Sequence, residues 1–341
     1  MLNRVYRLVS PHQFEPVETQ IDLTRAEVVV RPTFLSICNA DQRYFQGQRP
    51  AGVLARKLPM ALIHEGIGVV RIDNTGTYQP GQRVVMLPNA PTAADKVIAE
   101  NYLTTSRFCG SGFDGFMQEY VELPVKRVLP LPGYLDDSVA SFTEIVSVAM
   151  HAVSRFESIS HARRDTLGVW GDGNLGFLVA LSLRAVFPKA HIVVVGRNSY
   201  KLDEFTFVDD VRLSYDIPAS LHVDHAFECC GGEGSADAID QIIDVIEPEG
   251  AVGLLGVTEN RVPVNTRMVL EKGLRLFGNS RSGRVDFQRV LELYETNPRM
   301  VQYLSSLVGQ EIRVASTNEM AEAFDSDKRK PMGKTVLEWA V

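Results

Sequence analysis

The chain has 341 residues, of which 45% are hydrophobic and 23% are charged, and these values are typical of a globular protein. Its length predicts two domains around a large buried core. The 35 Lys and Arg residues against 42 Asp and Glu give a net charge of −7. No overall basic field therefore exists to bind nucleic acid or an anionic membrane.

The N-terminus and the cysteines both indicate a cytoplasmic protein. The stretch MLNRVYRLVSPHQF has no apolar core followed by small residues, so it does not resemble a signal peptide. No apolar run approaches the roughly 20 residues that a membrane span needs. The cysteines form neither a disulfide framework nor a CxxC pair; they are Cys38, Cys109, Cys229 and Cys230.

The first part of the chain, up to residue 147, has the pattern of an irregular antiparallel barrel. Short apolar stretches alternate there with turns rich in Gly, Pro and Asn, such as NTGTYQPG. We expect strands in AEVVVRPTFLSIC, GIGVVRI, GQRVVML and GFMQEYVEL. Such a series of short strands favours a barrel over alternating helices and strands.

After residue 147 the pattern changes to alternating strands and helices. Strands are predicted in TLGVWG, HIVVVG, HVDHAFEC, AVGLLGV and LRLFGNS, and helices in FLVALSLRAVF and ADAIDQIIDVI. This alternation predicts parallel βαβ units. The strand-like tail GKTVLEWAV is expected to rejoin the first domain. The predicted domains are therefore 1–147 with 284–341, and 148–283.

The segment GDGNLG, residues 171 to 176, matches the dinucleotide-binding pattern G-x-G-x-x-G. It follows an apolar strand and opens an apolar helix, which is the context that gives the pattern meaning. Gly171 permits a tight turn, Gly173 lets the backbone approach a pyrophosphate, and Gly176 lets helix and strand pack closely. Asn174 and Leu175 contribute backbone donors at the helix N-terminus. The alternative is a glycine-rich turn that binds nothing.

The end of the second βαβ strand predicts NADP(H) rather than NAD(H). NAD-binding proteins usually place an acid there for the ribose 2′-hydroxyl. Here HIVVVG runs into Arg197, Ser199 and Lys201, and the first acid is Asp203. A guanidinium can bind a 2′-phosphate bidentately, and a hydrogen bond to a charged group contributes on the order of 1.5–3 kcal/mol. The alternative is that Arg197 lies in a solvated loop.

Four residues are candidate ligands of a zinc ion: Cys38, His64, Glu65 and Glu144. A thiolate, an imidazole and carboxylates together suit zinc. Taken singly, Cys38 could be a small buried hydrophobe, His64 a hydrogen-bonded core residue, and the two glutamates surface acids. Only Cys109 lies between residues 86 and 120, so we expect one catalytic zinc and no structural zinc.

Several segments, in order along the whole chain, resemble the zinc-dependent medium-chain dehydrogenases/reductases: CNADQRYFQG, HEGIG, YQPGQRVV, DGFMQEYVELP, TEIVSVAMHA, GDGNLG and FECCGG. Within that superfamily, GSGFDGFMQEY, HAFECCGGEGS, VNTRMVLEKGL and SRSGRVDF are most similar to the ribulose-5-phosphate reductases of teichoic acid and capsule synthesis. The resemblance implies a GroES-like catalytic domain followed by a doubly wound Rossmann domain.

The resemblance also implies roles for particular residues. The metal set of sorbitol-type members carries over to Cys38, His64, Glu65 and Glu144, and Asp41 matches an aspartate that holds the ligating histidine. The backbone is expected to turn at the His-Glu pair, where Gly66 would relieve crowding.

Three departures from the family pattern stand out. Ala40 replaces a proton-relaying Ser or Thr, and Ile63 replaces a common Gly. Residues 89–112 lack the structural-zinc cysteines and need another means of holding their fold.

The implied activity is reduction of D-ribulose 5-phosphate to D-ribitol 5-phosphate by NADPH, feeding CDP-ribitol synthesis. Arg43 and Arg281 are our candidates for the substrate phosphate. The resemblance further implies a homodimer and a cytidylyltransferase partner. Two alternatives are another polyol or polyol-phosphate dehydrogenase of the superfamily, and a non-catalytic, nucleotide-sensing member.

Overall fold

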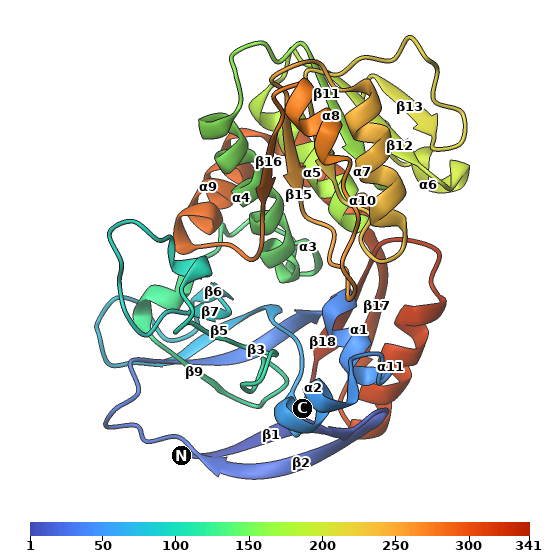
Figure 1. Ribbon diagram of the computed structural model, residues 1–341. Coiled ribbons are helices and arrows are strands. Elements are labelled where there is room, and N and C mark those ends of the chain that lie inside the picture. The colour runs from blue at the N-terminus through green and yellow to red at the C-terminus, as the bar shows by residue number, and fades with distance from the viewer. The chain divides into compact units, whose positions relative to one another are not determined.

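The computed structural model describes residues 1–341, and the chain divides into two compact units (Figure 1). Unit 1 comprises Met1–Glu144 and Ser282–Val341, and unit 2 comprises Ile145–Arg281. Helix α4, Thr143–Ile159, runs through the first boundary. The boundary expected at residue 147 therefore falls inside one helix. No helix of the structure is both long enough and apolar enough to span a membrane.

Unit 1 is built from short strands in three sheets. One sheet has the order β2-β1-β4, a second has β10-β6-β5-β3-β18-β17 with β9 also paired to β3, and the third is β7-β8. The strands are β1 Leu2–Ser10, β2 Gln13–Gln20, β3 Val28–Ser36, β4 Met60–Ala61, β5 Glu65–Asp73, β6 Arg83–Met86, β7 Asn89–Ala90, β8 Arg107–Phe108, β9 Val121–Leu123, β10 Val128–Pro130, β17 Val308–Val314 and β18 Lys334–Trp339.

The helices of unit 1 are α1 Asn39–Phe45, α2 Ala51–Lys57, η1 Glu100–Tyr102, η2 Val125–Arg127, α3 Asp137–Ser141, α9 Arg284–Thr296, α10 Pro298–Ser306 and α11 Thr317–Arg329. Two short helices of unit 1, α1 and α2, lie between β3 and β5, in the stretch of chain that separates Cys38 from His64 and Glu65. The core of the unit includes the stacked rings of Phe14 and Phe45, with Phe324 of α11 tilted against both.

The C-terminal strand lies inside the largest sheet of unit 1, between β3 and β17. Strand β18 pairs antiparallel with β3, with Val336 opposite Ser36 (Figure 1). Strand β3 in turn pairs with β5, where Ser36 lies opposite Glu65. Residues more than 250 positions apart, such as Glu65 and Lys334, are thereby brought to the same end of one sheet.

Unit 2 is a six-stranded parallel sheet with the order β13-β12-β11-β14-β15-β16. This is the doubly wound order, in which β12 and β13 lie on one side of β11 and β14 to β16 lie on the other. The strands are β11 Thr166–Trp170, β12 His191–Gly196, β13 Asp210–Leu213, β14 His225–Glu228, β15 Ala251–Leu254 and β16 Arg275–Gly278. The helices are α5 Asn174–Val186, α6 Ser199–Leu202, α7 Gly234–Val245 and α8 Thr266–Glu271. The α/β fold class, an irregular barrel plus a Rossmann sheet, is confirmed.

Some predicted elements are shorter than expected, and others were missed. The strand predicted over 115–123 is regular only in β9, because residues 115–117 bond instead to backbone groups of residues 61–63. Strand β13, Asp210–Leu213, was missed because its alternation of polar and apolar residues covers only four positions. Helices α9 to α11 were not predicted either.

An ion pair closes the lobe of residues 89–112, which lacks zinc-binding cysteines. The buried Arg127 donates to both carboxylate oxygens of Glu100, at 2.9 and 2.8 Å, and to the carbonyl of Asn89. Glu100 also accepts from the backbone N–H of Arg284, at 2.7 Å. Burial alone would raise the pKa of Glu100, but these bonds and the charge of Arg127 outweigh it and lower that pKa.

Removing this guanidinium should loosen the lobe. In Arg127→Met the Glu100 carboxylate loses two charge-assisted bonds, so we expect the free energy of unfolding to fall by about 1–3 kcal/mol. Proteolysis within residues 91–106 should become faster. Lys126→Met, which removes the neighbouring exposed cation, is the matched control and should leave both measurements unchanged. If the two variants were cleaved at the same rate and had the same free energy of unfolding, the proposed closure would be contradicted.

Candidate active site

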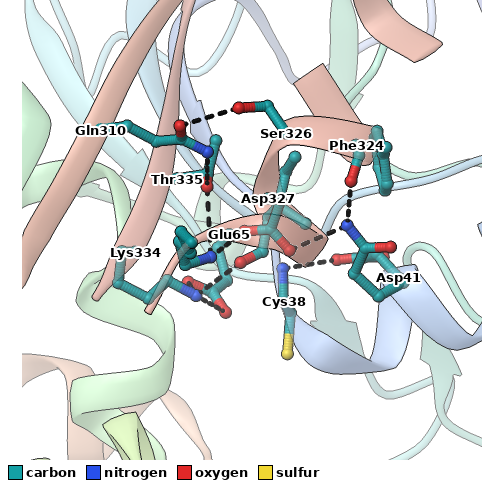
Figure 2. Close-up of polar contacts among 12 residues, drawn as sticks. Cys38, Asp41, Glu65, Gln310, Phe324, Ser326, Asp327, Lys334 and Thr335 are labelled. Carbon is teal, nitrogen blue, oxygen red and sulfur yellow. Dashed lines mark hydrogen bonds and ion pairs between the residues drawn. The ribbon is translucent and has the colours of Figure 1, made fainter. Parts of the chain in front are cut away.

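The Asp41 carboxylate fixes the backbone at Cys38 and at Ile63, the residue before His64. One oxygen accepts from the N–H of Ile63 at 3.0 Å. The other accepts from the N–H of Cys38 at 3.1 Å, as Figure 2 shows. The first oxygen also lies 3.5 Å from Nδ1 of His64. Asp41 is fully buried in α1, so this single side chain joins α1 to the start of β5.

The turn ahead of His64 is made by a strained residue rather than by glycine. Ile63 has φ of +66°, a conformation that costs a β-branched residue on the order of 1–3 kcal/mol. The bond from its N–H to Asp41 helps to hold this conformation. Gly66 relieves crowding as expected, but it does so between strands rather than at the turn, because a Cβ there would lie 2.5 Å from the side chain of Leu35 on β3.

Three of the four predicted ligands converge. The donor atoms of Cys38, His64 and Glu65 lie within 4.8 Å of one another. Glu144 is outside that group of three, but its carboxylate is 4.0 Å from Nε2 of His64. His64, Glu65 and Glu144 are all buried, and Cys38 as a whole residue is half-buried. One ring nitrogen of His64 thus faces Asp41 and the other faces Glu144.

A buried lysine holds Glu65, and neither its position nor its role was predicted from the sequence. The Nζ of Lys334 lies 2.9 Å from both oxygens of Glu65, with hydrogen-bond geometry toward Oε1 (Figure 2). It also donates to the carbonyl of Ile37 at 2.8 Å. Oε2 of Glu65 has no hydrogen-bond partner although it is buried, and it is the oxygen that remains available to a ligand.

A second polar network lies beside this pair. Asp327 of α11 accepts from Gln42 at 2.8 Å and is paired with Lys330. Lys330 also donates to Thr335, at 3.1 Å, and Gln310 donates to the same hydroxyl (Figure 2). These contacts fasten α11 to α1 and β18, and they hold the strand that carries Lys334.

The electrostatics of the ligand set favour a bound cation. Burial and the neighbouring Glu65 raise the pKa of Cys38, and burial raises the pKa of Glu144 to about 7. Burial would lower the pKa of His64, but Asp41 and Cys38 outweigh it and raise that pKa. The negative charge that Cys38, Glu65 and Glu144 would carry together exceeds the single charge of Lys334. Sulfur, nitrogen and oxygen donors in this arrangement fit a zinc ion.

The glycine-rich loop of unit 2 has the features that a nucleotide site requires. Gly171 has φ of +135° and follows β11, and a Cβ on Gly176 would lie 1.9 Å from the carbonyl oxygen of Gly171. A Cβ on Gly173 would meet nothing within 4 Å, so open space adjoins the first turn of α5. Asn174 and Leu175 form that first turn. Aligned backbone donors there can bind a pyrophosphate.

Asp172 organises the loop that was predicted to select the cofactor, and its role was missed from the sequence. One of its carboxylate oxygens accepts from the N–H groups of Arg197 and Asn198, at 2.7 and 2.8 Å, and from the side chain of Asn198 at 3.0 Å. The side chains of Arg197 and Ser199 are exposed, and Lys201 lies over the ring of Tyr200. Asp172 therefore ties the end of β12 to the glycine-rich loop.

Glu228, the last residue of β14, also fixes neighbouring loops through its carboxylate, and its role was likewise missed from the sequence. Its buried carboxylate accepts from the N–H groups of Cys230, Gly231 and Gly256, at 2.9 to 3.0 Å. The two predicted phosphate-binding arginines fall in different units, Arg43 in unit 1 and Arg281 in unit 2. An acid at or directly after the apolar end of a strand, as in TLGVWGD and HAFE, is the sequence signal that could have revealed Asp172 and Glu228.

An irregular barrel with a Cys-His-Glu ligand cluster, together with a Rossmann unit, defines a medium-chain dehydrogenase/reductase. Residues 24–133 match the alcohol dehydrogenase GroES-like domain. The chain is 52% identical to ribulose-5-phosphate reductase 1 of Staphylococcus aureus, over 99% of each protein. It is 51% identical to ribulose-5-phosphate reductase of Bacillus spizizenii, over the full length of both.

A solved structure agrees with these relatives. The crystal structure of S. aureus TarJ in complex with NADPH matches with a TM-score of 0.90 and 48% identity, covering 100% of both chains. The chain belongs to the ribulose-5-phosphate reductase family.

Breaking the Lys334–Glu65 pair should be costly. In Lys334→Met the Glu65 carboxylate stays buried without its cation, so we expect the free energy of unfolding of the metal-free protein to fall by about 3–5 kcal/mol. Adding Glu65→Gln should recover much of that loss. Lys328→Met, an exposed lysine of α11, is the control for urea denaturation. A loss no greater than that of Lys328→Met would refute the role of the pair.

Removing Asp172 should weaken the preference for NADPH. In Asp172→Ala the loop at Arg197 loses three bonds to one oxygen, so we expect the NADPH affinity to drop about tenfold, and the NADH affinity to drop less. Asp172→Asn, which keeps an acceptor oxygen, should retain most of the preference. The change in nicotinamide fluorescence on binding measures the NADPH and NADH affinities. Asp203→Ala, at an exposed position, is the control. An unchanged ratio of the two affinities in Asp172→Ala would rule this role out.

Proposed function

We propose that this protein reduces the ketone of D-ribulose 5-phosphate to give D-ribitol 5-phosphate, with NADPH as hydride donor and with one bound zinc ion. The buried cluster of Cys38, His64 and Glu65, with Glu144 beside it, is the observation that carries the proposal. The Arg197 loop and the high identity to ribulose-5-phosphate reductases support the choice of cofactor and substrate.

In this proposal Cys38, His64, Glu65 and Glu144 hold the zinc ion. When bound, zinc supplies Lewis acidity toward a carbonyl oxygen and leaves a coordination position for substrate. Asp41 orients His64 through Nδ1, so that Nε2 is the coordinating nitrogen. Lys334 holds Glu65 through a hydrogen bond to Oε1 and an ion pair to Oε2, and Oε2 accepts no hydrogen bond.

Unit 2 is the proposed NADP-binding domain. NADPH, when bound, supplies the hydride. Gly171, Gly173 and Gly176 with the first turn of α5 would receive its pyrophosphate, and Arg197, Ser199 and Lys201 its 2′-phosphate. Ala40, in the first turn of α1, carries no exchangeable proton. The proton that completes the reduction therefore comes from another group.

Further expectations follow from this assignment. We propose that the protein is cytoplasmic, forms a homodimer and supplies D-ribitol 5-phosphate to a cytidylyltransferase that makes CDP-ribitol for teichoic acid or capsule synthesis. The absence of a membrane-spanning helix is compatible with this location. Size-exclusion chromatography with light scattering tests the dimer, and pull-down with the cytidylyltransferase tests the partner.

The purified protein should oxidise NADPH when D-ribulose 5-phosphate is added, and much more slowly with NADH, xylulose 5-phosphate or unphosphorylated ribulose. Chelation should abolish the activity, and zinc should restore it. Cys38→Ser should lose more than about a hundredfold in kcat/KM, since even groups behind metal ligands contribute 10- to 100-fold. Metal analysis should find one zinc per chain. Activity that survives chelation, with metal content near zero, would overturn the zinc assignment.

A further inference from the structure

A cluster of cations surrounds Tyr44 in unit 1. Lys57, the last residue of α2, donates from Nζ to the hydroxyl of Tyr44 at 2.9 Å and to that of Ser111 at 2.8 Å. The guanidinium of Arg49 lies 5.0 Å from the centre of the Tyr44 ring, and Nζ of Lys57 lies 5.6 Å from it. Arg43 precedes Tyr44 in α1. We call Arg43, Arg49, Lys57, Tyr44 and Ser111 the basic cluster.

The cluster concentrates positive charge. Both hydrogen bonds described for Lys57 go to neutral hydroxyls, so they orient its ammonium without neutralising it. Partial burial and the charge of Arg49 lower the pKa of Arg43. Neighbouring positive charges repel one another and destabilise the protein. A bound dianion would be attracted to all of them and would offset that repulsion.

The cluster borders the candidate metal ligands. Helix α1, which carries Arg43 and Tyr44, begins directly after Cys38. On the other side, the ring of Phe108 lies 5.3 Å from the ring of His64. A Cβ on Gly110 would lie 3.6 Å from Nδ1 of His64, and Ser111 is the next residue. The segments that position Lys57 are therefore the same segments that enclose the ligand site.

We propose that the basic cluster binds the phosphate of the sugar substrate, with Lys57 and Ser111 as principal donors and Arg49 and Arg43 as supporting cations. The inference rests on the proposed function, in which the ketone lies at the metal ligands. In an open-chain 2-ketopentose 5-phosphate, the phosphate is attached three carbons beyond the ketone. A group that borders the ligand site is therefore placed to receive it.

The chemistry of the cluster suits a phosphate monoester. Guanidinium and ammonium groups form strong charge-assisted bonds to phosphate oxygens. Because two hydroxyls already hold the ammonium of Lys57, less side-chain freedom is lost when the anion binds. The nucleotide phosphates have their own donors at the start of α5 in unit 2. The cluster in unit 1 is thus assigned to the phosphate of the sugar.

The kinetic test compares Lys57→Met with Arg56→Met, which removes an exposed cation from the adjacent position of α2. Lys57→Met should raise KM for D-ribulose 5-phosphate about ten- to a hundredfold, with a much smaller change in kcat. The KM for NADPH and the kcat/KM for unphosphorylated ribulose should stay unchanged. Ser111→Ala should raise the sugar-phosphate KM several-fold, and Arg56→Met should not raise it. Thermal unfolding confirms that each variant is folded.

Calorimetric titration with D-ribitol 5-phosphate and with inorganic phosphate gives a readout that does not depend on turnover. The wild-type protein should bind both ligands, and Lys57→Met should bind both at least tenfold more weakly. An unchanged sugar-phosphate KM and unchanged calorimetric affinities in Lys57→Met would overturn the cluster while leaving the reductase activity intact. Weaker binding of NADPH rather than of the sugar phosphate would also overturn it.

The two proposals can fail separately. If the wild-type protein reduces no sugar phosphate, the proposed function falls, and the phosphate titration still decides whether the cluster is an anion site. If Lys57→Met then lost phosphate binding, the basic cluster would still be an anion site, but its ligand would not be the sugar phosphate proposed here as substrate. Equal phosphate binding in both proteins would reject the site as well.

Discussion

The ligand site depends on one carboxylate, that of Asp41. It accepts hydrogen bonds from the backbone of Cys38 and of Ile63 and lies beside the ring of His64. Those three groups come from two segments that are separated by α1 and α2, and the Asp41 carboxylate joins them. The same carboxylate stabilises Ile63 in its left-handed conformation, which turns His64 and Glu65 into the interior. Local strain at one residue thus sets the direction of two ligands.

Two lysines of unit 1 show how context decides what an ammonium does. Lys334 is buried and bonded to Glu65, so its charge offsets an acid and orients a ligand. Lys57 is only partly buried, and its described bonds go to two hydroxyls, which leaves its charge available to an anion. The negative ligand set and the positive cluster lie on neighbouring segments. A substrate with a ketone at one end and a phosphate at the other complements that arrangement of charge.

The sequence was sufficient for the fold class and the glycine-rich loop, because these depend on local patterns such as GDGNLG. It also named Cys38, His64 and Glu65, whose donor atoms the fold brings within 4.8 Å of one another. It was insufficient for Lys334, whose contact with Glu65 exists only because β18 pairs with β3. Lys57 was one of several basic residues near Cys38, and its bonds to Tyr44 and Ser111 depend on how three segments pack. Asp172 lay within a recognised motif, but the motif describes glycines and carries no information about the bonds of the residue between them.

The closure of the 89–112 lobe by Arg127 and Glu100 has a consequence for the cell that makes this protein. A lobe held by thiolates around a zinc ion requires that metal to fold, and it loses the metal when oxidants modify the thiolates. A guanidinium paired with a carboxylate needs neither metal supply nor reduced sulfur. Starvation for zinc would therefore spare the shape of this lobe, and in the proposed zinc enzyme it would act through the ligand site instead.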